Sequence, residues 1–164
     1  MKTAIITFFD SIPPKTGSGI VCSDFFKSWP FTKKKLFQFS IIKINNNNIE
    51  TIAIFKNTAF FKLINLPNLI LKIIKYFKNE KKKIVIIEGP SWIFYSFFVV
   101  FFFRIFYQNI FLIYRSHSIE YEIRKKNSNL LISILTKFFE NYVVNNCDIS
   151  TSVSTIEQKK FKRY

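Results

Sequence analysis

The segment KTAIITFFDSIPPKTGSG, residues 2–19, carries the strongest indication of the fold. Residues 3–9 form a short apolar run that is rich in β-branched residues and ends in a turn with two prolines. A run of this kind is typical of a strand buried on both faces, as in a parallel sheet. Two of the three glycines of the chain, Gly17 and Gly19, come next, and residues 20–29 have the apolar spacing of a helix. We therefore expect a buried strand, a glycine-containing loop and a helix, in that order.

The rest of the chain alternates between apolar runs typical of strands and segments with helical spacing. Expected strands cover residues 36–44, 51–56, 83–89, 109–117 and 147–154, and expected helices cover residues 65–83, 91–108, 130–146 and 154–164. The last helix would begin at a capping box, with Ser154 at its N-cap and Glu157 three residues later. Alternation of this kind predicts an α/β fold with a Rossmann-like parallel sheet that is flanked by helices. The length fits one domain, residues 1–164.

The glycine-containing loop has a position that suits anion binding. Ligands of parallel α/β sheets bind at the carboxyl ends of the strands, and Gly17, Ser18 and Gly19 follow the first expected strand. Glycine lets the backbone approach an anion, and the first N–H groups of a helix point toward it. The alternative is a plain strand-to-helix turn, in which the glycines serve only tight packing. The loop by itself leaves both interpretations open.

The composition disfavours some classes of function. The net charge is +15, but the basic residues are scattered in short clusters without a basic motif interleaved with aromatic residues, so we expect no nucleic-acid binding. Attraction to anionic lipid remains compatible with this charge. Cys22 and Cys147 lie far apart, with no CxxC motif and no histidine at ligand spacing, so we expect neither a metal site nor a disulfide. The N-terminal apolar run lacks the features of a signal peptide, which together with the cysteines predicts a reducing, cytoplasmic setting.

The most apolar segment of the chain is residues 91–108. Its uninterrupted apolar part, residues 92–103, is shorter than the roughly 20 residues that a membrane-spanning helix needs. We therefore expect a helix packed on the sheet rather than a membrane span. Phenylalanines on every side of such a helix would leave an exposed apolar surface, which usually marks an interface or a membrane contact. Peripheral membrane contact through residues 92–107 is the corresponding prediction.

The segment with the most reactive side chains is YRSHSIEYEIRKK, residues 114–126, which follows an expected strand. It contains His117, the single histidine of the chain, with Arg115, Ser116 and Glu120 close by. Histidine can act as an acid, a base or a donor to phosphate near neutral pH. The alternative is an exposed loop with ordinary charges. The place of His117 at the carboxyl end of a strand favours a functional role.

Four segments, in this order, resemble the N-terminal half of a GT-B glycosyltransferase of family 4. They are TAIITFF (residues 3–9), IPPKTGSG (12–19), RSHSIEYE (115–122) and NNCDISTSVSTIEQKKF (145–161). The last is similar to a recurrent passage of the family in which alanine and aspartate precede an apolar strand, a serine and a helix. Cys147 stands here in the place of the alanine. The resemblance extends over essentially the whole chain.

The resemblance implies a retaining transferase that moves a sugar from a nucleotide-sugar donor to a cell-envelope glycan or a lipid-linked acceptor. Such enzymes in general need neither a bound metal nor another cofactor. Residues 17–19 would approach the diphosphate of the donor, and His117 would be the catalytic residue beside the reacting sugar. Arg115, Ser116 and Glu120 would line the cleft between donor and acceptor.

The second domain of this family, which carries the nucleotide site and a pair of glutamates, has no counterpart within residues 1–164. We therefore expect that this chain alone does not transfer sugar, and that the missing domain is supplied elsewhere, for example by a separate chain. The alternative is a non-catalytic, membrane-associated remnant or interaction module. We expect either kind of protein in the cytoplasm or on the cytoplasmic face of a membrane.

Overall fold

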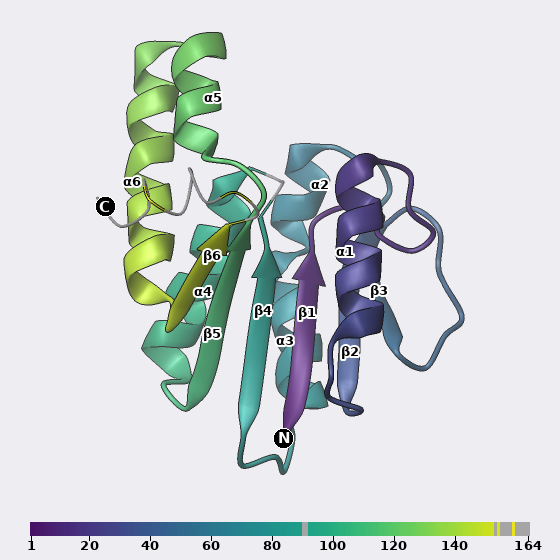
Figure 1. Cartoon of the computed structure of the whole chain (residues 1–164). Coiled ribbons are helices and arrows are strands. Elements are labelled where there is room, and N and C mark those ends of the chain that lie inside the picture. The colour runs from purple at the N-terminus through teal and green to yellow at the C-terminus, as the bar shows by residue number, and fades with distance from the viewer. Residues whose placement is uncertain (90–91, 153, 155–158, 160–164) are drawn as a thin grey trace.

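The computed structural model describes residues 1–89, 92–152, 154 and 159. The strands are β1 (Lys2–Thr7), β2 (Lys34–Ser40), β3 (Ile49–Ala53), β4 (Lys83–Glu88), β5 (Ile110–Ser116) and β6 (Ile149–Ser152). The helices are α1 (Gly17–Ser28), α2 (Ala59–Ile64), α3 (Leu66–Tyr76), α4 (Ile93–Phe106), α5 (Glu120–Asn127) and α6 (Leu130–Asn146). Figure 1 shows how these elements are arranged.

The six strands form one parallel sheet in the order β3-β2-β1-β4-β5-β6. The first strand lies inside the sheet, where Ile5 is paired with Leu36 on one side and with Ile86 on the other. It is buried on both faces, because neither Ala4 nor Ile5 is exposed to solvent. The predicted Rossmann-like α/β fold is thus confirmed.

Helices cover both faces of the sheet (Figure 1). On one face, Phe26 of α1 packs against Ile5, Leu36 and Ile86. On the other face, α3, α4 and α6 contribute to a larger apolar cluster whose fully buried members include Leu69, Val99, Phe103 and Val143. This larger cluster is the main core of the protein.

The predicted helix over residues 91–108 is confirmed as α4, which packs on the sheet. Val99, Val100 and Phe103 on its inner side are fully buried. Across the described part of the chain, no helix combines the length and the apolar character that crossing a bilayer requires.

Two helices were not predicted, and one prediction falls outside the described residues. Helix α2 has only six residues, AFFKLI, which are too few to show a helical period. Helix α5 has the sequence EYEIRKKN and buries only Glu120, which gives no apolar stripe. The predicted strand over residues 36–44 ends earlier, at Ser40. The predicted capped helix over residues 154–164 lies mostly outside the described residues.

Candidate functional site

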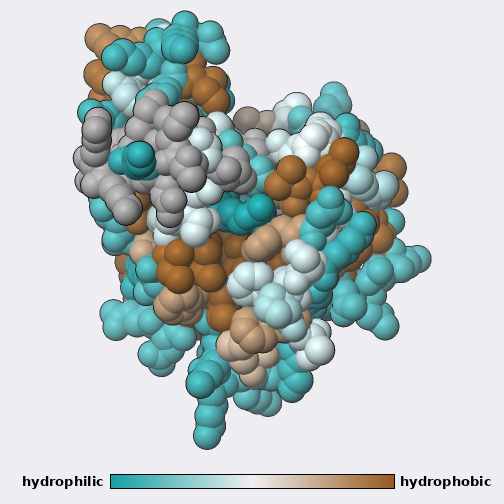
Figure 2. All heavy atoms as spheres, in the orientation of Figure 1, coloured by the Kyte–Doolittle hydropathy of each residue, from teal (hydrophilic) through white to brown (hydrophobic). Residues whose placement is uncertain are grey.

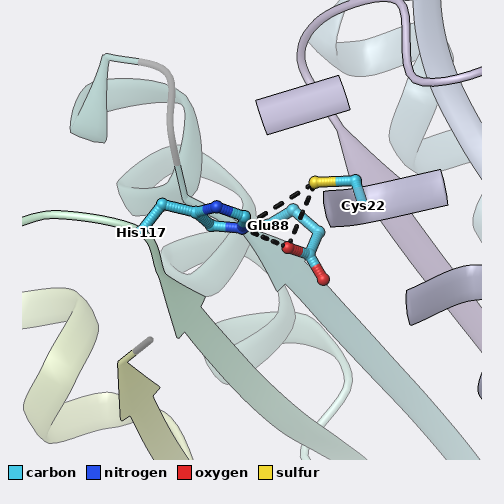
Figure 3. A group of neighbouring side chains, drawn as sticks. All are labelled: Cys22, Glu88 and His117. Atoms are coloured by element: carbon cyan, nitrogen blue, oxygen red, sulfur yellow. Dashed lines mark hydrogen bonds and ion pairs between the residues drawn. The ribbon is translucent and has the colours of Figure 1, made fainter. Parts of the chain in front are cut away.

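A fully buried carboxylate, Glu88 at the end of β4, is the centre of the candidate site. Arg115 Nη1 lies 3.0 Å from its Oε1 and 2.9 Å from its Oε2. His117 Nε2 lies 2.7 Å from Oε2, and the Cys22 thiol donates to the same oxygen at 3.3 Å. Figure 3 shows Cys22 and His117 converging on Glu88 from opposite sides. Side chains from three segments that are distant in sequence therefore meet here: Cys22, Glu88, and the pair Arg115 and His117.

The sheet topology explains why these residues meet. Strands β4 and β5 are parallel neighbours in which Glu88 is paired with Arg115, and His117 follows directly after β5. Cys22 comes from α1, which follows β1, the other neighbour of β4. From β1 the chain runs to β2 and β3 on one side, whereas β4, β5 and β6 lie on the other side. The site therefore lies at the carboxyl edge where the strand order reverses, which is the usual place for ligands in such sheets.

Gly89 follows Glu88, and the packing around it explains why this position is a glycine. A Cβ atom at this position would lie 2.7 Å from the Tyr114 hydroxyl oxygen and 2.8 Å from a carbon of its ring. Because the Tyr114 side chain is fully buried, it has little room to move away. Only glycine fits here, and the backbone after Glu88 is fixed further by the hydrogen bond from Gly89 N–H to the carbonyl of Arg115 (2.9 Å).

The charges within the site are balanced internally. The Arg115 guanidinium offsets the charge of Glu88, and its central carbon lies 4.2 Å from the centre of the Phe25 ring. Burial, and next the Glu88 carboxylate, raise the pKa of the Cys22 thiol well above its usual value. Cys22 is therefore a protonated hydrogen-bond donor near neutral pH and not a thiolate nucleophile.

The contact between His117 and Glu88 determines which nitrogen of the imidazole carries a proton. An ionised carboxylate only accepts hydrogen bonds, so Nε2 of His117 is the donor in this contact. In the neutral tautomer that carries its proton on Nε2, Nδ1 is the acceptor nitrogen of the ring. A carboxylate that holds a histidine in one tautomer and one orientation is a common partner of catalytic histidines.

Cys22, Glu88 and His117 also form a possible set of metal ligands, because their ligand atoms all lie within 4.8 Å of one another. Thiolate, carboxylate and imidazole are the ligands that zinc prefers. Two features of the site disfavour a cation. Arg115 already places a positive charge on the carboxylate, and the raised pKa of Cys22 opposes formation of the thiolate. The set fits a hydrogen-bonded cluster better than a metal centre.

The glycine-containing loop forms the first turn of α1. Thr16 is the N-cap, and its side-chain oxygen accepts from Gly19 N–H at 3.1 Å. A Cβ atom at Gly19 would lie 3.0 Å from the Asp10 carbonyl oxygen, whereas one at Gly17 would have no neighbour within 4 Å. Gly19 is thus explained by packing against its own loop, as in the plain-turn alternative. Gly17 and Ser18 keep the predicted position at the N-terminus of the helix, where an anion could bind.

The loop before α1 is held by a residue that the sequence analysis missed. Gln38, fully buried in β2, accepts from the backbone N–H groups of Ser11 (3.2 Å) and Ile12 (3.0 Å) through Oε1. Its Nε2 donates to the Ile12 carbonyl at 2.8 Å. The peptide bond between Ile12 and Pro13 is cis. A single amide in the apolar strand sequence LFQF was the signal that could have identified this residue.

The structure separates the predicted site residues into two groups. Arg115 and His117 both contact Glu88. Ser116 instead forms a local turn, in which its hydroxyl donates to the Ser118 carbonyl at 2.7 Å. Glu120 accepts from Ile93 N–H at the start of α4 and from the guanidinium of Arg124.

The roles of Ser116 and Glu120 in the structure are therefore to hold a turn and a helix N-terminus. Besides Gln38, the sequence analysis missed Glu88 and Cys22 as site residues. Glu88 could have been noticed, because it follows an apolar strand in the same way as the segment that contains His117.

Residues 17–19 lie near the His117 group. The Cys22 thiol is 3.8 Å from His117 Nε2. Gly19 precedes Cys22 by three residues on the same helix, a rise of about 4.5 Å along its axis. The arrangement fixes the imidazole of His117 and can offer backbone N–H groups to an anion nearby. Neither a protein-family model nor a curated protein sequence matches this chain, so the site itself carries the functional conclusion.

Proposed function

We propose that this chain is the N-terminal, acceptor-side half of a retaining GT-B glycosyltransferase. The whole enzyme would move a sugar from a nucleotide-sugar donor to a cell-envelope glycan or a lipid-linked acceptor. The observation that carries the proposal is the position of His117, which is held by Glu88 at the carboxyl edge and lies close to the first turns of α1 through Cys22. Catalytic groups have to converge on one reacting centre, and these elements converge.

The residues of this half would have distinct tasks. Retaining transfer requires stabilisation of an oxocarbenium-like sugar and of a leaving diphosphate. His117 would face the sugar, and Glu88 would hold its imidazole in one orientation. The N–H groups of Gly17 and Ser18, at the start of α1, would face the diphosphate. Arg115 would hold Glu88 in place rather than bind substrate, because its guanidinium is engaged with that carboxylate.

The remaining tasks belong to a second domain. In GT-B enzymes the reaction takes place between two domains, so this chain would form one wall of the cleft and would be inactive alone. The nucleotide site and its paired glutamates would be contributed by the other wall. No metal or cofactor enters this scheme. The protein would work in the cytoplasm or at the cytoplasmic face of a membrane.

Peripheral membrane contact through residues 92–107 is part of this proposal. On α4 the side chains of Phe98, Phe101 and Phe106 remain 38%, 41% and 64% exposed. Exposed aromatic rings on one helix suit a lipid surface, and a lipid-linked acceptor would be reached from there.

A non-catalytic interaction module is the second candidate. The observation in its favour is that Glu88, Arg115 and His117 satisfy one another within the chain. A cluster of this kind can be purely structural.

The first experiment is to read the encoding DNA beyond codon 164. The proposal expects an open frame, direct or shifted, or a neighbouring gene, that encodes a second α/β domain with a paired-glutamate site. That domain and this chain together are then assayed for transfer of labelled sugar from nucleotide sugars to a membrane extract. The variant His117→Ala should abolish transfer, whereas Asp24→Asn, which changes an exposed residue, should not. Unrelated downstream sequence, or transfer that is unchanged in His117→Ala, would refute the catalytic proposal.

A further inference from the structure

Helix α6 buries polar side chains and exposes apolar ones over its first three turns, which is the reverse of the usual pattern for a helix that packs on a core. Its buried side chains in the first three turns are polar, namely Ser133, Thr136 and Glu140. The opposite face consists of Leu131, Ile134, Leu135 and Phe138, which are 66%, 56%, 45% and 59% exposed. These four positions have the spacing i, i+3, i+4 and i+7 of a continuous stripe. We name them the α6 stripe.

The buried polar face is fixed in its orientation, so the helix cannot rotate to bury the stripe. The carboxylate of Glu140 accepts from Glu120 N–H at 2.8 Å and from Tyr121 N–H at 3.2 Å, and so caps the N-terminus of α5. The buried Thr136 hydroxyl is satisfied within α6 itself, because it donates to the Ile132 carbonyl at 2.8 Å. Rotation would break the cap and bury the stripe against α5. Within the described residues the stripe is therefore a true surface feature.

The α6 stripe continues onto α4. The ring of Phe138 lies 6.4 Å from that of Phe97, which lies 5.7 Å from that of Phe101. Phe98 and Phe101 are more than a third exposed. The apolar surface thus extends over two helices, and contiguous apolar patches of this kind mark sites of association.

The two helices α5 and α6 also carry exposed lysines. Lys125 and Lys126 lie in the last turn of α5, and Lys137 precedes Phe138 on α6; all three are exposed. The ammonium of Lys137 also lies 5.4 Å from the centre of the Tyr121 ring on α5. Helices α5 and α6 stand side by side and project beyond the carboxyl ends of the strands (Figure 1). On this projection hydrophilic and apolar side chains lie next to one another (Figure 2).

We propose that the α5–α6 hairpin is a docking surface for an anionic lipid bilayer. The α6 stripe would enter the boundary between headgroups and acyl chains, and the three lysines would contact anionic headgroups. An amphipathic helix with lysines beside its apolar face binds bilayers in this way. The lysines favour a lipid surface over a second copy of this chain, because two hairpins would bring like charges together and the chain has a net charge of +15.

This inference does not depend on sugar transfer, and it assigns the main contact to α6 rather than to residues 92–107 alone. His117 lies just before α5. Docking of the hairpin would therefore place the carboxyl edge of the sheet, with the Glu88 cluster, next to the membrane.

The test is co-sedimentation of the chain with vesicles of phosphatidylcholine alone and of phosphatidylcholine with 30% phosphatidylglycerol, a composition chosen to give roughly the surface charge of a cytoplasmic leaflet. The wild-type chain should bind the anionic vesicles and lose most of this binding in high salt. The double variant Leu131→Gln, Leu135→Gln should bind about ten-fold more weakly or less, since it removes two side chains from the apolar contact. The charge reversal Lys125→Glu, Lys126→Glu should weaken binding to a similar extent.

The matched control is Leu71→Gln on α3, which is 66% exposed, as Leu131 is, and lies outside the hairpin. It should bind as the wild type does. Circular dichroism should show that all variants remain folded. Absence of binding to anionic vesicles, equal binding to neutral vesicles, or unchanged binding by the stripe variant would each overturn the proposal. The proposal would also be overturned if light scattering showed a dimer of the wild-type chain, the stripe variant were a monomer, and the wild type did not bind lipid.

Discussion

Replacing Glu140 by glutamine should change how the stability of this protein depends on pH. Burial raises the pKa of Glu140 from 4.5 to about 7, against the two backbone hydrogen bonds that lower it. The folded state therefore holds a proton on Glu140 over the range between these two pKa values, where the unfolded state has lost it. Because the folded state binds more protons, the free energy of unfolding falls as the pH rises through this range.

The size of the effect follows from the shift in pKa. A difference of one pKa unit corresponds to about 1.4 kcal/mol, so the loss of stability between pH 5 and pH 8 is about 2.5 kcal/mol. Glutamine has the shape of the protonated side chain but does not ionise. The variant Glu140→Gln should thus gain about 2.5 kcal/mol relative to the wild type between pH 5 and pH 8.

The assay is urea denaturation followed by circular dichroism at pH 5, 6, 7 and 8. The difference between variant and wild type should grow in favour of the variant as the pH rises. Asp24→Asn, in which the side chain replaced is 69% exposed, serves as the control for a lost negative charge and should show no such trend. A difference between Glu140→Gln and wild type that stays constant within about 0.5 kcal/mol would show that Glu140 is already ionised in the folded protein at pH 5, and would refute the reasoning.

Three further predictions use other parts of the structure. Gln38→Leu leaves three backbone groups of the loop before α1 without their partner and should lower the free energy of unfolding by about 2–4 kcal/mol in urea denaturation; a loss below about 0.5 kcal/mol would contradict it. Gly89→Ala places a methyl group against the Tyr114 ring and should lower the free energy of unfolding by about 1–3 kcal/mol. Gly17→Ala, whose methyl group would meet no neighbour within 4 Å, should leave the melting temperature unchanged or raised. Arg115→Met removes the cation beside Glu88, so it should increase the affinity for Zn²⁺ in equilibrium dialysis; equally tight binding by the wild type would show that Arg115 does not exclude a metal.

The sequence predicted the fold because each strand of a buried parallel sheet can be recognised from its own residues. The runs AII in β1 and IVII in β4 are apolar at every position, as is typical of a strand covered on both faces. Helix α5 was not predicted, because its stability comes from a distant residue. Its first N–H groups are capped by Glu140, which lies twenty residues after Glu120.

The candidate site was predictable in part for the same reason. His117 and Arg115 follow a strand, and their position was enough to select them. The importance of Glu88 depends on the pairing of β4 with β5, and that of Cys22 depends on the path of α1 across the sheet. Neither pairing is visible in a single sequence, because both residues meet their partners only after the chain has folded.

The strand order has a consequence for synthesis of the protein on the ribosome. Strand β1 is translated before both of its neighbours, and one of these, β4, ends only at Glu88. After β2 has emerged, about 50 residues still have to be translated before that edge of β1 is paired, which takes roughly 2–10 seconds at bacterial and eukaryotic elongation rates. During this time an apolar strand edge is open to pairing with other nascent chains. The nascent protein is therefore expected to need protection by chaperones until residue 88 has left the exit tunnel, and its yield should depend on how fast this stretch is translated.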